Sequence, residues 1–302
     1  MNLQFVADGV LTGLMIGLGA IGVTLTYAIL RFSNFAHGEF ISWGAYATLV
    51  ISGVFGWLAG GAAEPLDPFS FGWGVVAAGL VAMLLTGGLA LLLDLVLFRH
   101  LRDKAKSITV VMASFGASMA LRSLLEFSFT SRPVYFSREL QIAVPIGLGI
   151  RMTPDQLALV FVAAILGLGM HLLVTRTQIG RSMQAVSENP TLARVVGIDV
   201  DRVIRVTWML GGALACASGV MIGILVQIRP FMGADLLLPL FAAAILGGIG
   251  SVPGALLGGV IVGIGEAVAV QWVGAEWRAA IAFLLLVAVL LVRPTGIFGK
   301  PA

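Results

Sequence analysis

The sequence predicts an all-α polytopic membrane protein, on three observations. Hydrophobic residues make up 59% of the 302 residues, charged residues only 11%, and the mean hydropathy is +1.04, whereas an ordinary soluble domain has roughly 25% charged residues. Continuous apolar runs such as Val75–Phe98 and Leu157–Val174 are long enough, or nearly so, to cross a hydrocarbon core of about 30 Å as helices. These runs lack the alternation of a membrane β-barrel, so helices are expected.

About eight segments are expected to span the membrane, together with a shorter, interrupted or re-entrant apolar segment at residues 236–249. The short segment leads into the sequence GGIGSVPGALLGG at Gly247–Gly259. Proline and glycine in a membrane segment free backbone polar groups that only protein or water can satisfy. The break therefore lies beside a pathway, or it is an ordinary turn between two helices. The expected full spans are residues 5–30, 36–57, 72–98, 107–128, 155–175, 204–226, 253–272 and 277–293.

The basic residues predict an orientation with the N-terminus outside. This orientation places twelve of the eighteen lysine and arginine residues on the cytoplasmic side, as the positive-inside rule requires. The C-terminus is then cytoplasmic only if the short segment crosses as well, wholly or in part. The start MNLQFVAD lacks the basic residues of a signal peptide, so the first span is expected to be retained. We expect one transmembrane domain over residues 1–302.

Glycines recur every fourth residue in the first expected span, at Gly9, Gly13 and Gly17. Stripes of small residues at this spacing let two helix backbones approach closely. The sequence therefore predicts a helix-packing face here, either within this chain or against another subunit.

An external loop is expected at about residues 130–155. It contains three prolines and the arginines Arg138 and Arg151, and it reads as a loop with a short helix or a hairpin. Arg229 is also placed outside by the expected spans. Because complementary charge aids encounter and register between proteins, Arg138 and Arg151 are candidates for docking an acidic partner surface. The alternative is that these arginines are simply solvated.

A cytoplasmic loop at about residues 176–205 is the longest polar stretch of the chain. Asn189 is a good helix N-cap, Pro190 suits the first helical position, and Gly197 can end a helix in a left-handed conformation. These signals predict a short helix with the sequence PTLARVV, preceded by a second helical piece. Helices of about two turns are marginal in water. Support would come from a partner protein that accepts Leu192, Val195 and Val196, or from lipid headgroups around the arginines.

The sequence NFAHGEF places Asn34, His37 and Glu39 at the start of the second expected span. Because a charged side chain at the bilayer centre costs ~2.5–3.5 kcal/mol, Glu39 is expected near the inner interface or facing a polar cavity. One interpretation is structural: Asn34 caps the helix and Glu39 interacts with its dipole. The other is functional: the three residues form the inner end of a translocation path or brace the cytoplasmic loop.

Two further polar positions occur inside expected spans. Glu266, in VGIGEAVAV, has no evident partner in the sequence, so it is expected to face a cavity or to hydrogen-bond a neighbouring helix. Arg122 and Glu126 are four residues apart, which predicts a local ion pair on one helix.

Several site types are not expected in this chain. The single cysteine, Cys216, and the scattered histidines, His37, His100 and His171, offer no disulfide framework and no metal site. The net charge of +3 follows the topology and gives no indication of nucleic acid binding. No G-x-x-x-x-G-K-[ST] phosphate loop occurs in the sequence.

Four motifs together carry a family resemblance over almost the whole chain. GRSMQAVSENPTLARVVGID resembles the cytoplasmic coupling motif of ABC importer permeases, in the form found in branched-chain amino acid permeases. NFAHGEF, LGGIGSVPGALLGG and LVRPTGIFGK resemble segments of the LivH-type members, in the same order and at comparable separations. The resemblance implies the ABC importer permease architecture and a transporter subunit that is not an enzyme.

The resemblance also implies partners and site residues. It implies a second, LivM-like permease, two ABC ATPases that bind ATP and Mg, and a periplasmic substrate-binding protein, all at the bacterial inner membrane in contact with lipid. This chain would then bind no cofactor. The contacts with the ATPases are assigned, by resemblance, to Ala185, Glu188, Asn189, Ala193 and Gly197.

Branched-chain amino acids are the expected substrates, and other functions remain open from the sequence. Related permeases are similar to ones that handle urea, short amides, or aromatic and other carboxylic acids. An ion-coupled secondary transporter would also use broken helices and buried carboxylates. A membrane receptor or scaffold would show no substrate flux.

Overall fold

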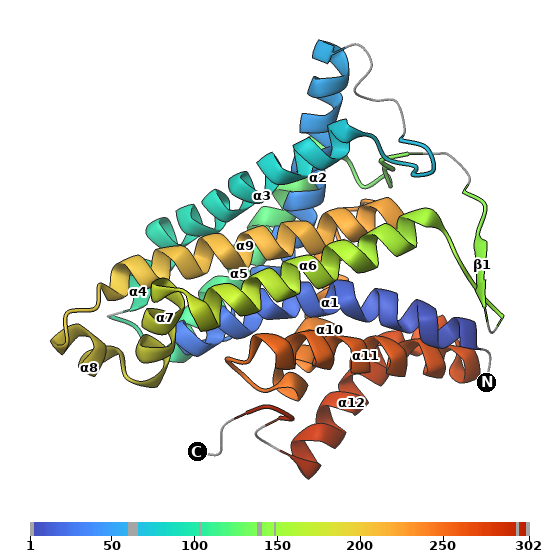
Figure 1. The fold of residues 1–302 in the computed structure, drawn as a ribbon. Helices are drawn as coiled ribbons and strands as arrows, with labels where there is room; N and C mark the ends of the chain where they lie inside the picture. Colours follow the sequence, from blue (N-terminus) through green and yellow to red (C-terminus); the bar gives the residue numbers. More distant parts are fainter. Residues whose placement is uncertain are drawn as a thin grey trace.

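The computed structural model describes residues 3–59, 66–102, 104–137, 141–147, 149–293 and 296–299. Among these residues, seven helices are long and apolar enough to cross a membrane, which confirms the all-α polytopic class. Figure 1 shows a bundle with α8 (Pro190–Val195) at one end and the N-terminus and β1 (Val144–Gly147) at the other. These are called the α8 end and the β1 end below.

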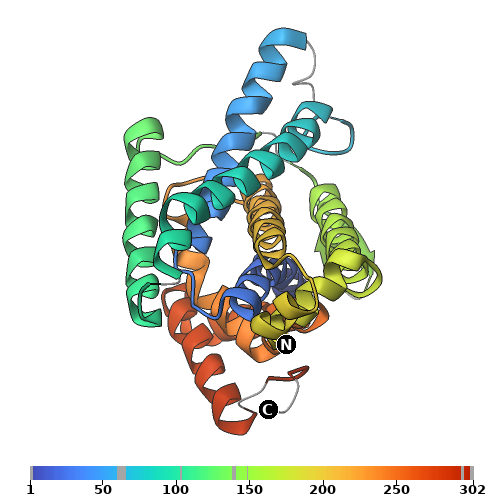
Figure 2. The ribbon, with the colours of Figure 1, turned by 90° about the vertical axis from the view of Figure 1, so that its left-hand side faces the viewer.

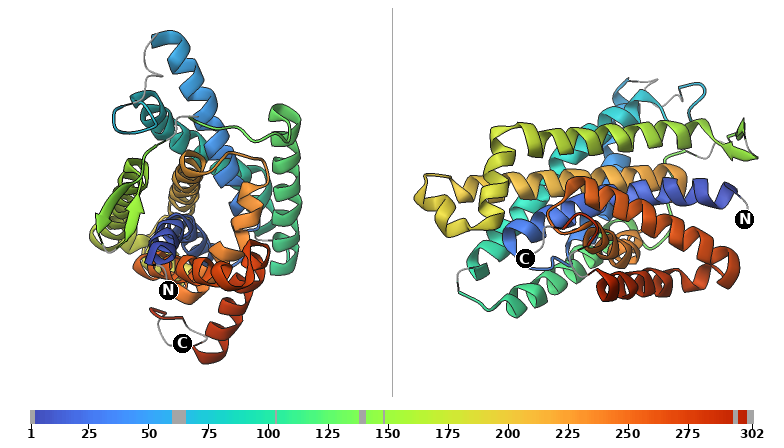
Figure 3. Two further views of the ribbon diagram at one scale, coloured as in Figure 1. Left: turned by 90° about the vertical axis from the view of Figure 1, so that its right-hand side faces the viewer. Right: turned by 60° about the horizontal axis from the view of Figure 1, so that its bottom comes forward.

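Helix α1 (Leu3–Leu30) is the central helix of the bundle. Its most apolar window is 83% buried, compared with 22% for α5 (Ser107–Phe129). It is packed against α9 (Val200–Leu225), α10 (Met232–Gly247) and α11 (Val252–Val273). The view along the bundle in Figure 2 shows α5 at the periphery, apart from α9, and the opposite view in Figure 3 agrees.

The glycine stripe of α1 packs against α11 within this chain. A Cβ atom added to Gly13 would lie 2.6 Å from the carbonyl oxygen of Gly259, and one added to Gly259 would lie 2.4 Å from the Cα of Gly17. Only glycines allow two helix backbones to approach this closely. The stripe is therefore an internal packing face.

The next helices form one side of the bundle. Helix α2 (His37–Ala59) rises from the centre of the bundle in Figure 1, and α3 (Trp73–Leu93) crosses it toward the α8 end. A π-helical turn (Asp94–Phe98) joins α3 to α4 (Arg99–Arg102). There the buried Asp94 accepts a hydrogen bond from Arg102, so the end of this long helix carries its own ion pair.

The external loop contains the hairpin that the sequence allowed. Strand β1 pairs antiparallel with β2 (Ile150–Met152). The Gln4 side chain donates to the Arg151 carbonyl oxygen at 3.0 Å and accepts from the Arg151 amide at 2.8 Å. The hairpin is thereby attached to the start of α1. Helix α6 (Pro154–Arg176) follows, and a capping box of Thr153 and Gln156 fixes its first turn.

The last part of the chain contains two short helices. Helix α10 has 16 residues with Pro239 inside. It is short, as expected for residues 236–249, but it begins at Met232 and is a continuous helix. The segment expected as a full span at 277–293 forms the 15-residue α12 (Arg278–Val292), about 22 Å long at 1.5 Å per residue. Gly274, with φ 100°, ends α11 and a 3-10 turn (Ala275–Trp277) follows, at the break expected between residues 272 and 277. Figure 3 shows α12 extending away from the bundle.

Candidate functional site

The coupling loop folds into two short helices at the α8 end, as its capping residues predict. Helix α7 (Gln178–Glu188) is followed by α8, and the Asn189 side chain accepts hydrogen bonds from the amides of Thr191 and Leu192 at 3.0 Å each. Gly197 ends the turn after α8 with φ 87°. The sequence thus determines the start and the end of this helix locally.

Helix α8 presents an apolar face outward. Leu192, Val195 and Val196 are 59%, 78% and 67% exposed, whereas Ala193 is only 3% exposed. Ala193 therefore packs inside the loop, and its side chain is not available for the contact assigned to it by resemblance. The other assigned positions, Glu188, Asn189 and Gly197, are exposed and Ala185 is half-buried. The available contact surface is the apolar face of α8 with these neighbours.

Arg31 connects the coupling loop to the central helix. Its Nη2 donates to the carbonyl oxygens of Ser187 at 3.1 Å and Glu188 at 3.0 Å, at the last residues of α7. A cation at a helix C-terminus is favourable because it complements the helix dipole. Arg31 has φ 56°, a left-handed conformation that is unusual for a residue other than glycine. Arg31 is therefore a direct hydrogen-bonded link between the end of α1 and the C-terminus of α7.

A cavity of about 700 Å³ lies beside the coupling loop. Its wall includes Ser187 and Glu188 from α7, Gly250 and Pro253 from the α10–α11 turn, and Phe298. The Gly250 amide donates to the Thr24 hydroxyl of α1 at 2.7 Å. The glycine-rich break is thus a turn between two helices at the α8 end, where it forms part of an open surface next to the coupling loop.

The NFAHGEF segment lies deep in the bundle. His37 Nε2 donates to the Gly19 carbonyl oxygen at 3.1 Å, and Gly19 is about 16 Å from the end of α1 at 1.5 Å per residue. Asn34 Oδ1 accepts from the Ala36 amide at 3.1 Å, which closes the turn that leads into α2; among the described residues, no helical amide of α2 donates to this oxygen. Asn34, His37 and Glu39 are all buried, so the chain re-enters the bundle before α2 begins.

Glu39 pairs with α5, and the expected pair of Arg122 with Glu126 is wrong. Arg122 donates to Glu39 Oε1 from Nη2 at 2.6 Å and from Nε at 3.2 Å, and the Ser118 hydroxyl donates to the same oxygen at 2.9 Å. Arg122 pairs with Glu39 on another helix because the fully buried Glu39 carboxylate needs a charged hydrogen-bond partner. Glu39 Oε2 has no hydrogen-bond partner among the described residues.

A sequence signal for this contact was present on α5. Ser114, Ser118 and Arg122 recur every fourth residue, so they share one helix face. The Ser114 hydroxyl accepts from the Phe35 amide at 3.1 Å, which extends the same polar contact toward the α8 end. A polar stripe on an otherwise apolar helix indicates the face that turns away from lipid.

Glu266 is buried and has a partner that the sequence did not reveal. Its Oε2 lies 3.9 Å from Nε of Arg278 at the start of α12, while Oε1 has no hydrogen-bond partner among the described residues. The contact joins α11 to α12, so it holds the short last helix against the bundle.

Of the two candidate docking arginines, the structure describes Arg151. Arg138 lies outside the described residues. Arg151 is exposed on β2, on the opposite end of the bundle from α8. Arg229 lies in the loop between α9 and α10, where its Nη2 is 3.3 Å from Asp235 Oδ2.

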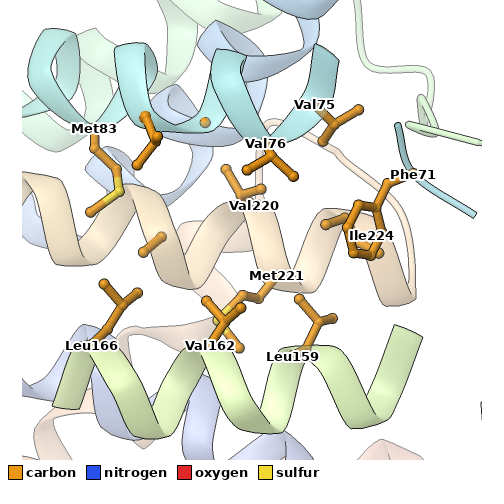
Figure 4. Close-up of a pocket in the computed structure, with 13 residues that line it drawn as sticks. Phe71, Val75, Val76, Met83, Leu159, Val162, Leu166, Val220, Met221 and Ile224 are labelled. Carbon is orange, nitrogen blue, oxygen red and sulfur yellow. The ribbon is translucent and has the colours of Figure 1, made fainter. Parts of the chain in front are cut away.

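An apolar cavity between α3, α6 and α9 does not suit a charged ligand. It has a volume of about 160 Å³, and Figure 4 shows side chains such as Val76, Met83, Leu166 and Met221 pointing into it. Its lining residues are all apolar. Because an unpaired charge in apolar surroundings is costly, this cavity suits hydrocarbon, and the charged groups of an amino acid need another site.

Comparisons with known proteins agree over the whole chain. The model of the family described as "Branched-chain amino acid transport system / permease component" matches residues 5–290. The high-affinity branched-chain amino acid transport system permease protein LivH of Escherichia coli (strain K12) is 33% identical over 99% of this chain and 96% of its own length. BraD of Pseudomonas aeruginosa, with the same description, is 31% identical over 99% of this chain and 96% of its length.

An archaeal relative is also similar: a probable LivH of Methanocaldococcus jannaschii is 27% identical over 93% of this chain and 87% of its own length. No solved structure matches the chain. The matched relatives are transport permeases, in agreement with the expectation of a transporter subunit that is not an enzyme. This chain belongs to the family of permease components of branched-chain amino acid transport systems.

Proposed function

We propose that this chain is the transmembrane permease subunit of an ATP-driven ABC importer for branched-chain amino acids. The observation that carries the proposal is the capped helix α8, which presents Leu192, Val195 and Val196 at one end of the bundle. Exposed apolar patches rimmed by polar residues are typical of protein interaction sites. The sequence similarity to LivH and BraD over 99% of the chain supports the substrate class.

The assembly would have two ABC ATPases at the α8 end, and they would bind the ATP and Mg. A second, LivM-like permease would complete the path, and a periplasmic binding protein would dock at the β1 end, where Arg151 is exposed. The membrane would be the bacterial inner membrane, with the N-terminus outside and the C-terminus in the cytoplasm.

Coupling would run through contacts of the described residues. When the ATPases close, they would displace α7 and α8, and Arg31 would pass this movement to the end of α1. Because α1 is packed on α9, α10 and α11, its shift would change the packing of the whole bundle. Small shifts of packed helices are a common means of switching between two states.

The test is uptake of radiolabelled leucine by proteoliposomes that contain the purified complex and its binding protein. The proposal is supported if leucine accumulation requires ATP on the side of the α8 end and is inhibited by valine and isoleucine. Accumulation driven by a proton or sodium gradient without ATP would instead identify a secondary transporter. Competition by urea, acetamide or benzoate, and not by valine, would change the substrate class.

A further inference from the structure

Two ion pairs lie side by side where α10 begins. One is the buried pair of Glu39 and Arg122, and the other is the pair of Arg229 and Asp235, with N–O distances of 2.6 Å and 3.3 Å. The Arg122 guanidinium lies 5.2 Å from the centre of the Phe231 ring, and Phe231 stands between Arg229 and Asp235 in the chain. Phe231 therefore connects the buried pair to the segment that carries the exposed pair.

This region lies at the middle of the bundle. The Gly233 amide donates to the Ser42 hydroxyl at 3.0 Å, and a Cβ atom added to Gly19, near the middle of α1, would lie 2.5 Å from Leu240 Cδ2. The first turn of α10 is thus packed on the first turns of α2, level with the central part of α1. In a membrane-spanning bundle this level corresponds to the hydrocarbon core.

The outer pair is exposed at this depth. The side chains of Arg229 and Asp235 are 50% and 56% exposed in the single chain. Charged side chains in a membrane segment are costly against lipid, and they face a bundle interior or a water-filled cavity. The face of α10 that carries this pair is therefore directed to an aqueous path.

A further polar contact lies next to this face. The Tyr135 hydroxyl donates to Gln227 Oε1 at 3.2 Å, two residues before Arg229, whereas Ser114 and Ser118 of α5 are buried against residues 33–39. Pro239 has no N–H, so the ordinary helical hydrogen bond to the Asp235 carbonyl oxygen is not formed. Helix α10 continues through Pro239, so the Asp235 carbonyl oxygen is an acceptor without its usual helical donor.

We propose that Arg229 and Asp235 bind the zwitterionic backbone of the transported amino acid as it passes the middle of the membrane; this proposal rests on the proposed function. The substrate carboxylate pairs with the Arg229 guanidinium, and its ammonium group pairs with the Asp235 carboxylate. Phe231 and Leu236, beside the two charges in the chain, provide apolar contact for a branched side chain. The Glu39–Arg122 pair is a positioning pair that holds α2 and α5 beside the site.

The charge balance suits transient binding. In the empty site the two protein charges neutralise each other, and with a zwitterion bound each finds a new partner of opposite sign. No unpaired charge is created in either state, so the site avoids the cost of an isolated buried charge. A transport pathway needs binding that is favourable enough for entry and weak enough for release.

The test uses the assembled complex in proteoliposomes with a thiol introduced by Phe231→Cys, which retains both charges. The native Cys216 is completely buried and gives the background rate. The reagent is the anionic, membrane-impermeant 2-sulfonatoethyl methanethiosulfonate, and the matched control is Leu84→Cys, on α3, whose native side chain is 68% exposed. If the first variant does not assemble, Ala234→Cys on the same turn replaces it.

The proposal expects faster modification at position 231 than at position 84, and slowing of that reaction by leucine during ATP-driven turnover. Isoamylamine and 4-methylpentanoate, which each lack one of the two charges, should slow it less. Equal rates at the two positions, or no effect of leucine while uptake is normal, would overturn the proposal. Arg229→Gln should lower leucine uptake roughly tenfold to a hundredfold through loss of a charged hydrogen bond.

Arg99→Gln is the control for that uptake measurement. Arg99 is an exposed arginine of α4, outside the coupling loop at residues 176–205 and outside the proposed site. Equal uptake in the two arginine variants would contradict a binding role for Arg229. An uptake assay of the unmodified complex separates the two proposals. If that complex does not import leucine, the proposed function itself is rejected; if it does, the variants test the role of Arg229 and Asp235.

Discussion

Arg122 of α5 and Glu39 of α2 join two helices through a single carboxylate oxygen, which accepts from Nη2 at 2.6 Å and from Nε at 3.2 Å. Helix α5 is peripheral and mostly exposed, and its other contacts with α2 include the Trp43 indole, which donates to the Leu121 carbonyl oxygen at 3.2 Å. The ion pair is therefore a principal attachment of α5 to the bundle.

Removal of one member of this pair should destabilise the protein strongly. In Arg122→Leu the fully buried Glu39 loses its charged partner, and breaking a buried pair from one side costs roughly 3–5 kcal/mol. The double variant Glu39→Leu/Arg122→Leu should recover most of this loss because no buried charge remains. Thermal unfolding of the detergent-purified chain measures both, and a single variant as stable as the unmodified protein would show that the pair is not structural.

The glycine contact between α1 and α11 predicts a clear difference between two substitutions. Gly13→Val would place side-chain atoms within 2.6 Å of the Gly259 carbonyl oxygen and the Val260 Cα, so the helices must separate and the folded protein should be largely lost. At Gly79 on α3 an added Cβ meets nothing within 4 Å, and Gly79→Val should be tolerated. Size-exclusion profiles of the two variants compare them directly.

The link between α1 and the coupling loop can be tested through Arg31. Arg31→Gln removes the charged donor to the carbonyl oxygens of Ser187 and Glu188. Hydrogen bonds to charged groups each stabilise a protein by about 1.5–3 kcal/mol. Amide hydrogen exchange of residues 185–195 should become faster, while exchange in α11 stays the same. Arg194→Gln, in the exposed α8 itself, serves as the control substitution. Unchanged exchange in the loop would rule out this support.

Gly197 predicts a coupling defect. Its φ of 87° is unfavourable for a side chain, and since an added Cβ has open space around it, the cost of Gly197→Val is conformational, roughly 1–2 kcal/mol. The turn after α8 should then rearrange, and the ratio of leucine transported to ATP hydrolysed should fall. Gly169→Val, at a helical position with similar free space, should leave the ratio unchanged. A normal ratio in both variants would remove Gly197 from the coupling contacts.

The sequence predicted most of this structure wherever the determinants are local. Asn189, Pro190 and Gly197 specify α8 by themselves, because capping hydrogen bonds and backbone preferences depend on adjacent residues. The long apolar runs likewise predict the spans. The expected spans 253–272 and 277–293 agree with α11 and α12 to within one residue at each end.

The partners of the charged residues could not be predicted in the same way. Glu39 and Arg122 are separated by 83 positions, and only the packing of α5 on α2 brings them together. The spacing of four residues predicted a pair of Arg122 with Glu126, whereas in the folded protein Arg122 pairs with Glu39. Arg229 lies in the loop between α9 and α10, as expected, but its ion pair with Asp235 was not predicted from the sequence.

The most direct test of the proposed function is to purify this chain through a C-terminal tag from its own membranes and to identify the bound proteins by mass spectrometry. The unmodified chain should recover two ATPases with phosphate loops and a second permease in constant ratio. Leu192→Asp/Val195→Asp, which changes only exposed side chains of α8, should fold normally and lose the ATPases. Recovery of the unmodified chain alone, still active in gradient-driven uptake, would contradict the account.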